Sequence, residues 1–274
     1  MIRDITLGQY YMADSKLHQL DPRVKIVCTF LFLISLFIQR NEVGYAAATI
    51  FLAFIIIMSR VPLSFILRGL KPIIILLMFT VILNLFLTPG EALLFQWRFL
   101  RIFEEGVRNA TYMGIRLIYL LIGSSLMTFT TTPNSLTDGL ESLFKPLEKV
   151  RVPVHEVAMM MSIALRFIPI LLEETDKIMK AQLARGADLD SGSIFRRVKA
   201  MVPILVPLFV SAFRRANDLA LAMESRCYHG GEGRTKMKPL KYKRKDVIAY
   251  GIMIVYLGVM IGARNFDHIR LWVL

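Results

Sequence analysis

The chain has 274 residues, of which 55% are hydrophobic, and a formal net charge of +13 at pH 7. Its mean hydropathy of +0.53 is too high for an ordinary soluble domain, so the composition indicates an integral membrane protein. A basic excess can mark a nucleic-acid-binding protein, but basic loops beside membrane spans account for it here, and no nucleic-acid partner is expected. The two cysteines, Cys28 and Cys227, lie in unlike segments, which argues against a disulfide and a zinc site.

Long uncharged runs predict five membrane-spanning helices. In chain order the runs measure 14, 17, 19, 21 and 17 residues, and a helix crosses the hydrocarbon core with about 20 residues, or about 17 at the short limit. The first run is short, so we expect Lys25 and Arg40 at its ends to extend toward the two interfaces. The polar first 22 residues lack the apolar core of a cleavable signal, so the first span is expected to direct insertion. The predicted spans lie near 25–40, 43–59, 72–88, 108–130 and 246–263.

Basic residues are concentrated in segment 134–245, which holds 20 Lys and Arg against 12 Asp and Glu, a net charge of +8. Because positively charged loops stay in the cytoplasm, we expect this segment and the N-terminus inside the cell and the C-terminus outside. The predicted organisation is therefore an N-terminal membrane region with four spans, a cytoplasmic or interfacial helical region, and a C-terminal span with its tail. These three regions cover 1–133, 134–245 and 246–274.

Two further apolar stretches, 155–186 and 193–227, are predicted to be long, bent, amphipathic helices at the cytoplasmic surface. The apolar part of the second, 200–213, has only 14 residues, which is about 21 Å of helix. Basic residues lie at both of its ends, so crossing the membrane would place one basic cluster outside. Prolines inside both stretches remove backbone hydrogen bonds and bend the helices: Pro169, Pro203 and Pro207. A shallow re-entrant hairpin is the alternative.

The remaining motifs point away from catalysis. A short amphipathic helix is predicted within 134–153, with Asn134 or Ser135 as its N-cap. The glycine-rich segment 229–235 lacks the spacing of a phosphate-binding loop and is expected to be a flexible hinge. The histidines are dispersed, so no metal site, no general base and no enzymatic activity are expected. The acidic residues of the first long helix are expected on its solvated face: Glu173, Glu174 and Asp176.

Both long helices are expected to end on an arginine between small residues. The six residues of these two tips are Ala184, Arg185 and Gly186, and then Ser225, Arg226 and Cys227. An ordinary helix stop also combines a basic last turn with glycine, which Arg185 fits fully and Arg226, followed by glycines at 230 and 231, fits loosely. The functional interpretation is that each guanidinium binds a carboxylate in a partly desolvated groove, whose walls approach closely because the neighbouring residues are small.

Taken together, three segments resemble one family, the transmembrane T component of energy-coupling factor (ECF) transporters, which are ABC importers of vitamins and other micronutrients. The segments are "GQYYMADSKLHQLDPRVKI", "AQLARGAD" and "AMESRCYHGGEGRTKMKPL". The resemblance covers nearly the whole chain. It implies an all-α, polytopic fold in the bacterial plasma membrane, with about five transmembrane helices and long amphipathic cytoplasmic coupling helices. The second motif departs from the family's Ala-Arg-Gly type, because Ser225-Arg226-Cys227 stands in its place.

The resemblance also implies partners and a mechanism. Arg185 and Arg226 each enter a groove on one of two ABC ATPases, a heterodimeric pair, and the T component holds one or more substrate-binding membrane S components. ATP-driven closure of the ATPases moves the coupling helices and reorients the S component. ATP is bound by the ATPases, so this chain carries no cofactor of its own and is not an enzyme.

A methionine run and a rival function complete the expectations. Met159, Met160 and Met161 form a candidate docking surface for the S component, since methionine adapts to several partners, although ordinary lipid-facing or core packing explains them equally well. The alternative function is a stand-alone secondary carrier or permease with a basic cytoplasmic loop. Carriers bury charges at the midplane and divide into repeats, and five nearly charge-free spans do neither.

Overall fold

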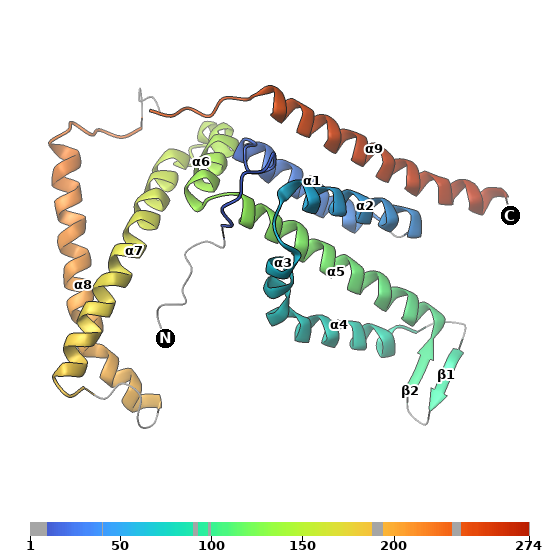
Figure 1. Ribbon diagram of the computed structural model, residues 1–274, viewed down its shortest axis with the longest axis horizontal. Helices are drawn as coiled ribbons and strands as arrows, with labels where there is room; N and C mark the ends of the chain where they lie inside the picture. Colours follow the sequence, from blue (N-terminus) through green and yellow to red (C-terminus); the bar gives the residue numbers. More distant parts are fainter. Residues whose placement is uncertain are drawn as a thin grey trace. The chain divides into compact units, whose positions relative to one another are not determined.

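The computed structural model describes residues 10–39, 41–89, 93–97, 100–187, 194–231 and 237–273 (Figure 1). The predicted all-α class is confirmed, and one small antiparallel hairpin, β1 (Leu93–Trp97) with β2 (Leu100–Phe103), is added to it. The helices are α1 (Pro22–Ile38), α2 (Glu42–Ser59), α3 (Leu63–Leu70), α4 (Ile74–Leu87), α5 (Glu104–Thr130), α6 (Pro133–Phe144), α7 (Val154–Ala184), α8 (Ile194–Glu224) and α9 (Arg244–Val273). Short 3-10 turns, η2 (Lys71–Ile73) and η3 (Lys145–Val150), follow α3 and α6.

The contacts divide the chain into two compact units. The first, here called the span unit, has two segments, Gly8–Gly139 and Leu240–Leu274. It contains α1 to α5, the first residues of α6, and α9. The second, here called the arm unit, contains the rest of α6 with α7 and α8, up to Pro239. The three-part division at residues 133 and 245 concerns sides of the membrane and stays a prediction.

The multi-pass membrane architecture is confirmed, but the helices that qualify as membrane spans differ from the predicted ones. Among the described residues, four helices are individually long and apolar enough to cross a membrane: α2, α5, α7 and α9 as far as Arg264. A fifth crossing needs α3 and α4 together, which bend by 64° at η2. The predicted third span, 72–88, is thus a 14-residue α4 preceded by a bend. Helix α1 has 17 residues, about 25 Å, which is near the short limit for a span.

Local capping explains where α1 and α6 begin. Asp21 caps α1 by accepting the Arg23 N–H at 2.9 Å, and Pro22 occupies the first helical position, where no N–H is needed. Burial by itself raises the pKa of the Asp21 carboxyl, but the hydrogen bonds from Arg23 outweigh it and hold that pKa below its usual range. The predicted cap of α6 is wrong, because Thr132 Oγ1 accepts the Ser135 N–H at 3.3 Å.

A buried polar cluster, here called the polar junction, ties three helix ends of the span unit together. Asp246 is 1% exposed, and its carboxylate accepts the Lys243 N–H at 2.7 Å and the Asp21 N–H at 2.9 Å. The first bond caps α9 and the second fastens α9 to the start of α1. Lys25 Nζ donates to Thr130 O at the end of α5, at 2.7 Å. Lys25 therefore bonds to carbonyls of its own protein, and its position at an interface stays a prediction. Arg40 lies outside the described residues.

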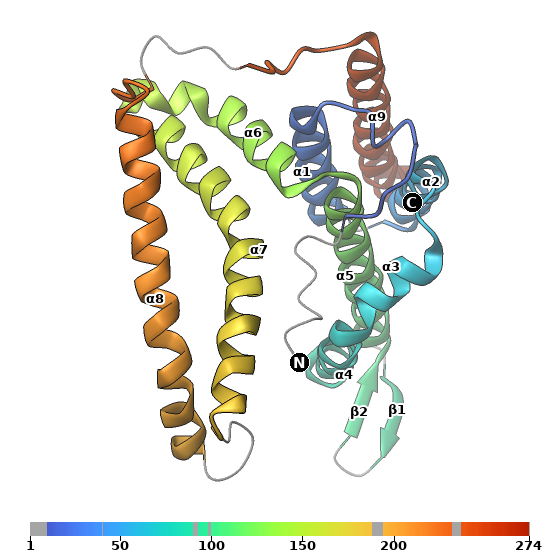
Figure 2. The ribbon, with the colours of Figure 1, turned by 60° about the vertical axis from the view of Figure 1, so that its left-hand side comes forward.

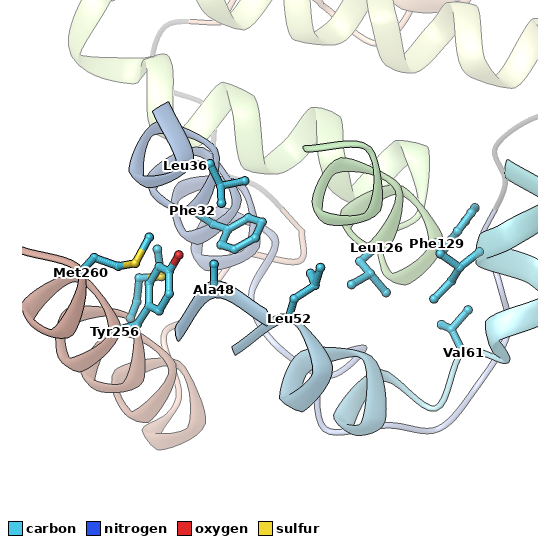
Figure 3. Packing of buried hydrophobic residues seen from close by; sticks show 11 residues of the cluster. Phe32, Leu36, Ala48, Leu52, Val61, Leu126, Phe129, Tyr256 and Met260 are labelled. Carbon is cyan, nitrogen blue, oxygen red and sulfur yellow. The ribbon is translucent and has the colours of Figure 1, made fainter. Parts of the chain in front are cut away.

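The apolar core of the span unit lies among α1, α2, α5 and α9 (Figure 3). Phe32 of α1 meets Phe51 of α2 with ring centroids 5.8 Å apart, and Phe51 stacks on Tyr256 of α9 at 4.1 Å. Small residues let these helices approach, and Ala48 of α2 is fully buried between them. Tyr256 also keeps its hydroxyl satisfied through Ser35 Oγ of α1, 2.9 Å away.

At the other end of α1, a half-buried cation was missed by the sequence analysis. Arg116 lies within the predicted fourth span and donates to the Gln39 carbonyl at 2.9 Å and to the Tyr45 hydroxyl at 3.1 Å. Gln39 follows the last residue of α1, so the guanidinium caps the negative end of that helix. Gln39 in turn donates through Nε2 to Met260 O of α9 at 2.6 Å. These bonds give the intramembrane charge a structural role.

Replacing Asp246 by alanine is expected to destabilise the span unit. The change leaves the buried Asp21 amide without its acceptor, at about 1–3 kcal/mol for an unsatisfied buried donor, and also removes the acceptor of the part-buried Lys243 amide. We expect a lower thermal midpoint by circular dichroism of the purified chain in detergent. Asp14→Ala, which removes an exposed carboxylate of the same unit, should have the same thermal midpoint as the wild type. Equal midpoints for Asp246→Ala and wild type would contradict the role given to the junction.

Candidate functional site

The arm unit is built on an antiparallel pair of long helices, α7 and α8 (Figure 2). The Arg215 guanidinium donates to Glu174 Oε2 through Nη2 at 2.9 Å and Nε at 3.3 Å. Glu174 therefore faces α8, and the prediction that it lies on the solvated face is wrong. An apolar cavity of about 270 Å³ lies between the two helices. It is lined by Ile163, Phe167, Leu171, Ala212, Arg215, Ala216, Leu219, Ala220 and Met223.

A second bond joins α7 to α8 at a position weakened by proline. Within a helix the Pro203 carbonyl would accept the N–H of residue 207, but Pro207 has none. Gln182 of α7 donates its side-chain N–H to that carbonyl at 3.4 Å. The proline break in α8 is thus partly repaired from α7, which ties the two helices together close to the end of α7.

The first arginine tip ends α7 in a Schellman motif. Gly186 has a φ of 84°, and its N–H donates to Leu183 O at 3.0 Å. The Ala187 N–H donates to Gln182 O at 3.0 Å. These two bonds satisfy carbonyls that the helix end leaves open and lock the backbone on both sides of Arg185. Arg185 is the C-cap residue, and its side chain is exposed.

The second tip has the same backbone geometry with a different residue in the left-handed position. The Cys227 N–H donates to Glu224 O at 2.8 Å and the Tyr228 N–H to Met223 O at 3.1 Å. Cys227 has a φ of 55°, where glycine is the usual residue. The helix therefore stops at Cys227, ahead of the glycines at 230 and 231 that the sequence suggested. Arg226 stands one residue before the left-handed position, as Arg185 does, and is exposed.

The two tips lie at opposite ends of the helix pair. Gln182 meets Pro203 and Glu174 meets Arg215, so the register carries Arg226 back beside the first turns of α7. With a rise of 1.5 Å per residue, roughly 35–40 Å of helix then separates Arg226 from Arg185. No single groove of ordinary size can receive both guanidinium groups.

Two packing contacts hold the Arg226 end, and no local sequence pattern predicts them. The Gly231 backbone lies directly against the His155 ring, where no side chain would fit. His155 Nδ1 lies 3.0 Å from Glu141 Oε1 of α6. The chain after Arg226 is thus packed onto the start of α7 as far as Gly231, so the predicted hinge does not include that residue; 232–235 lie outside the described residues.

The methionine run lies in the first turns of α7, at the same end of the pair as Arg226. Met160 is 57% and Met161 47% exposed, whereas Met159 is half-buried. Helix α8 adds exposed apolar residues along its length, including Val202, Val206, Phe209 and Phe213. Across the described residues, no group of three or more His, Cys, Asp or Glu side chains could hold a metal ion.

The two caps generate a matched pair of substitutions. Cys227→Gly should relieve a left-handed non-glycine residue, and Gly186→Ala should create one at a position with open space around the new methyl. The difference is about 1 kcal/mol at each site, which corresponds to roughly fivefold in local exchange. We expect slower amide hydrogen exchange over 221–227 in the first variant and faster exchange over 181–187 in the second. Unchanged exchange in both would contradict the assigned cap geometry.

Comparison with known proteins places this architecture in a family. The family described as "Cobalt transport protein", CbiQ, matches residues 13–237. The protein named "Energy-coupling factor transporter transmembrane protein EcfT" of Clostridium kluyveri is 53% identical over 265 residues, covering 96% of this chain and 98% of the relative.

Two more relatives carry the same name. The Ruminiclostridium cellulolyticum protein is 52% identical over 257 residues, covering 94% of this chain and 96% of its own length. The Bacillus subtilis protein is 47% identical over 264 residues, covering 96% of this chain and all of the relative. The chain therefore belongs to the CbiQ family and is a transmembrane component of the energy-coupling factor transporter type.

Proposed function

We propose that the chain is the T component that couples two ABC ATPases to a substrate-binding S component in a vitamin or micronutrient importer. The observation that carries the proposal is the pair of exposed arginines, Arg185 and Arg226, at the same position of two equivalent helix caps. Ala184 and Gly186 flank the first arginine, and Ser225 and Cys227 flank the second. In this proposal the arm unit and the N-terminus face the cytoplasm, and the C-terminus lies outside.

The cap geometry suits each arginine to docking. Both guanidinium groups extend from backbone held by two hydrogen bonds, so little backbone freedom is lost when a partner binds. A guanidinium offers a fork of donors that matches a carboxylate, and it stays charged when partly desolvated. The separation of the tips favours two grooves on two subunits over one groove on one subunit.

The contacts between α7 and α8 support the proposed transmission of motion from one tip to the other. Glu174 with Arg215, and Gln182 with the Pro203 carbonyl, join the helices at two levels. In this proposal α7 and α8 move together when the ATPases close. This role needs no nucleotide site on the chain, because ATP is bound and hydrolysed by the partners.

The S component is proposed to dock on the exposed methionines at the start of α7. Met160 and Met161 present flexible, polarizable side chains beside the Arg226 end of the pair. A surface that receives several S components needs such adaptability more than it needs a rigid shape. The rival function, a stand-alone carrier, is weakened by Arg116, since that intramembrane charge is bonded to Gln39 and Tyr45.

Charge reversal at the tips tests ATPase docking. In an affinity purification from the native host in mild detergent, wild type should retain two ATPases and a small membrane protein. Breaking a desolvated charged contact costs about 2–5 kcal/mol, so Arg185→Glu or Arg226→Glu should deplete the ATPases strongly and the double variant should lose them. Arg214→Glu, at an exposed position of α8 about 18 Å along the helix from Arg226, is the matched control. ATPases that stay bound to the double variant would overturn the assignment.

A second substitution separates the two partners. Met160→Lys/Met161→Lys places charge on the proposed S-component surface without touching either tip. We expect the S component to be lost from the purified complex while both ATPases remain. Full retention of the S component would show that these methionines face lipid instead.

A further inference from the structure

A cavity of about 530 Å³ lies inside the span unit, among the halves of α1, α2, α5 and α9 that surround the polar junction. We propose that it binds one anionic phospholipid, with an acyl chain among the helices and the phosphate at a ring of lysines. The volume falls in the range of about 300–1,000 Å³ that is typical of small-molecule pockets. Nothing in the coupling function requires this site.

The walls of the cavity are apolar on all four sides. Phe32 of α1, Leu52 and Ile55 of α2, Leu126 of α5 and Ile252 of α9 contribute to them. Such a surface favours a hydrocarbon chain over water, because each methylene removed from water on binding is stabilised. A lipid chain is therefore a better occupant than a polar solute.

Three positively charged side chains contribute to the lining of the cavity. Every charged residue that lines it is a lysine: Lys16, Lys25 and Lys245. Lys25 donates to Thr130 O at 2.7 Å and His18 O at 3.1 Å, and Lys245 donates to Gln19 Oε1 at 2.7 Å. An ammonium has three donors, so these bonds position both groups and leave a donor on each for a phosphate oxygen.

The nearby acids do not cancel this charge at the cavity surface. Asp21 accepts hydrogen bonds from Arg23, and Asp246 is turned toward the backbone amides of Asp21 and Lys243. Neither carboxylate lines the cavity. A polybasic segment, with Lys238, Lys241, Lys243 and Arg244, leads directly to Lys245. Basic segments next to a span attract anionic lipid headgroups.

The lining favours a lipid over a helix of another protein, because an apolar helix face would leave the lysines without an anionic partner. An acyl chain with its headgroup at the lysines uses both the apolar walls and the charged side chains.

Native mass spectrometry of the full chain tests the proposal. The probes are a phosphatidylglycerol and a phosphatidylcholine with identical acyl chains, each added to delipidated protein in detergent. We expect one phosphatidylglycerol to remain bound per chain and phosphatidylcholine to be lost. A lysine near an anionic headgroup is worth about fivefold in affinity, so Lys16→Gln/Lys245→Gln should bind roughly 30-fold more weakly. Lys177→Gln, which removes an exposed lysine of α7 outside both the lining and the polybasic segment, should bind as wild type does.

Cys28 lines the cavity and reports on its occupant directly. In a Cys227→Ser background it is the one remaining cysteine, and phosphatidylglycerol should slow its alkylation by a maleimide at least tenfold. Ala249→Phe, which fills the cavity from α9, should abolish this protection, while a thermal midpoint near that of wild type shows that the variant folds. Inorganic phosphate alone should give none.

Four results would each overturn the lipid site. Equal retention of the two lipids would show that the lysines do not select charge. Wild-type affinity in Lys16→Gln/Lys245→Gln would place the lipid elsewhere on the chain. Protection of Cys28 by inorganic phosphate, or its persistence in Ala249→Phe, would show that no acyl chain occupies the cavity.

Discussion

The span unit depends on one buried carboxylate. Asp246 accepts two backbone amides that belong to the starts of α1 and α9, helices separated by more than 200 residues of sequence. Inside a membrane protein an unpaired amide is costly, so these bonds fix which helix ends must meet. Lys25 extends the same junction to the end of α5 through Thr130. The aromatic packing of Phe32, Phe51 and Tyr256 follows from helices already held at one end.

In the arm unit the comparable constraint is the helix stop. A Schellman motif satisfies the last carbonyls and turns the chain, so the residue before the left-handed position projects from a rigid end. Arg185 and Arg226 both occupy that place. A helix stop is therefore compatible with the proposed docking role of each arginine, because the stop is what presents the side chain. The antiparallel register of α7 and α8 then places the two arginine tips at opposite ends of the helix pair.

Sequence reasoning failed where a polar group found a distant partner. Lys25 resembled a snorkelling residue, yet it bonds to a carbonyl 105 residues away. Glu174 resembled a solvated acid, yet it pairs with Arg215, 41 residues away. No local pattern predicted a role for Arg116, although it caps α1 through the Gln39 carbonyl. In each case the local pattern is the same whether the side chain meets water or protein, so periodicity and charge cannot distinguish the outcomes.

Local physics was sufficient for the rest. Apolar runs and prolines determined a multi-pass helical protein with two long helices over 155–186 and 193–227, because these features depend on neighbouring residues alone. That these two helices lie at the cytoplasmic surface stays a prediction, and α7 is itself long and apolar enough to cross a membrane. The arginine tips and the family resemblance also follow from short segments. Only the tertiary structure decided that Cys227 takes the left-handed position, that the tips lie at opposite ends of one pair, and that four helices line an apolar cavity together with three lysines. Those features arise from contacts between segments far apart in the chain, for which the sequence carries no local signal.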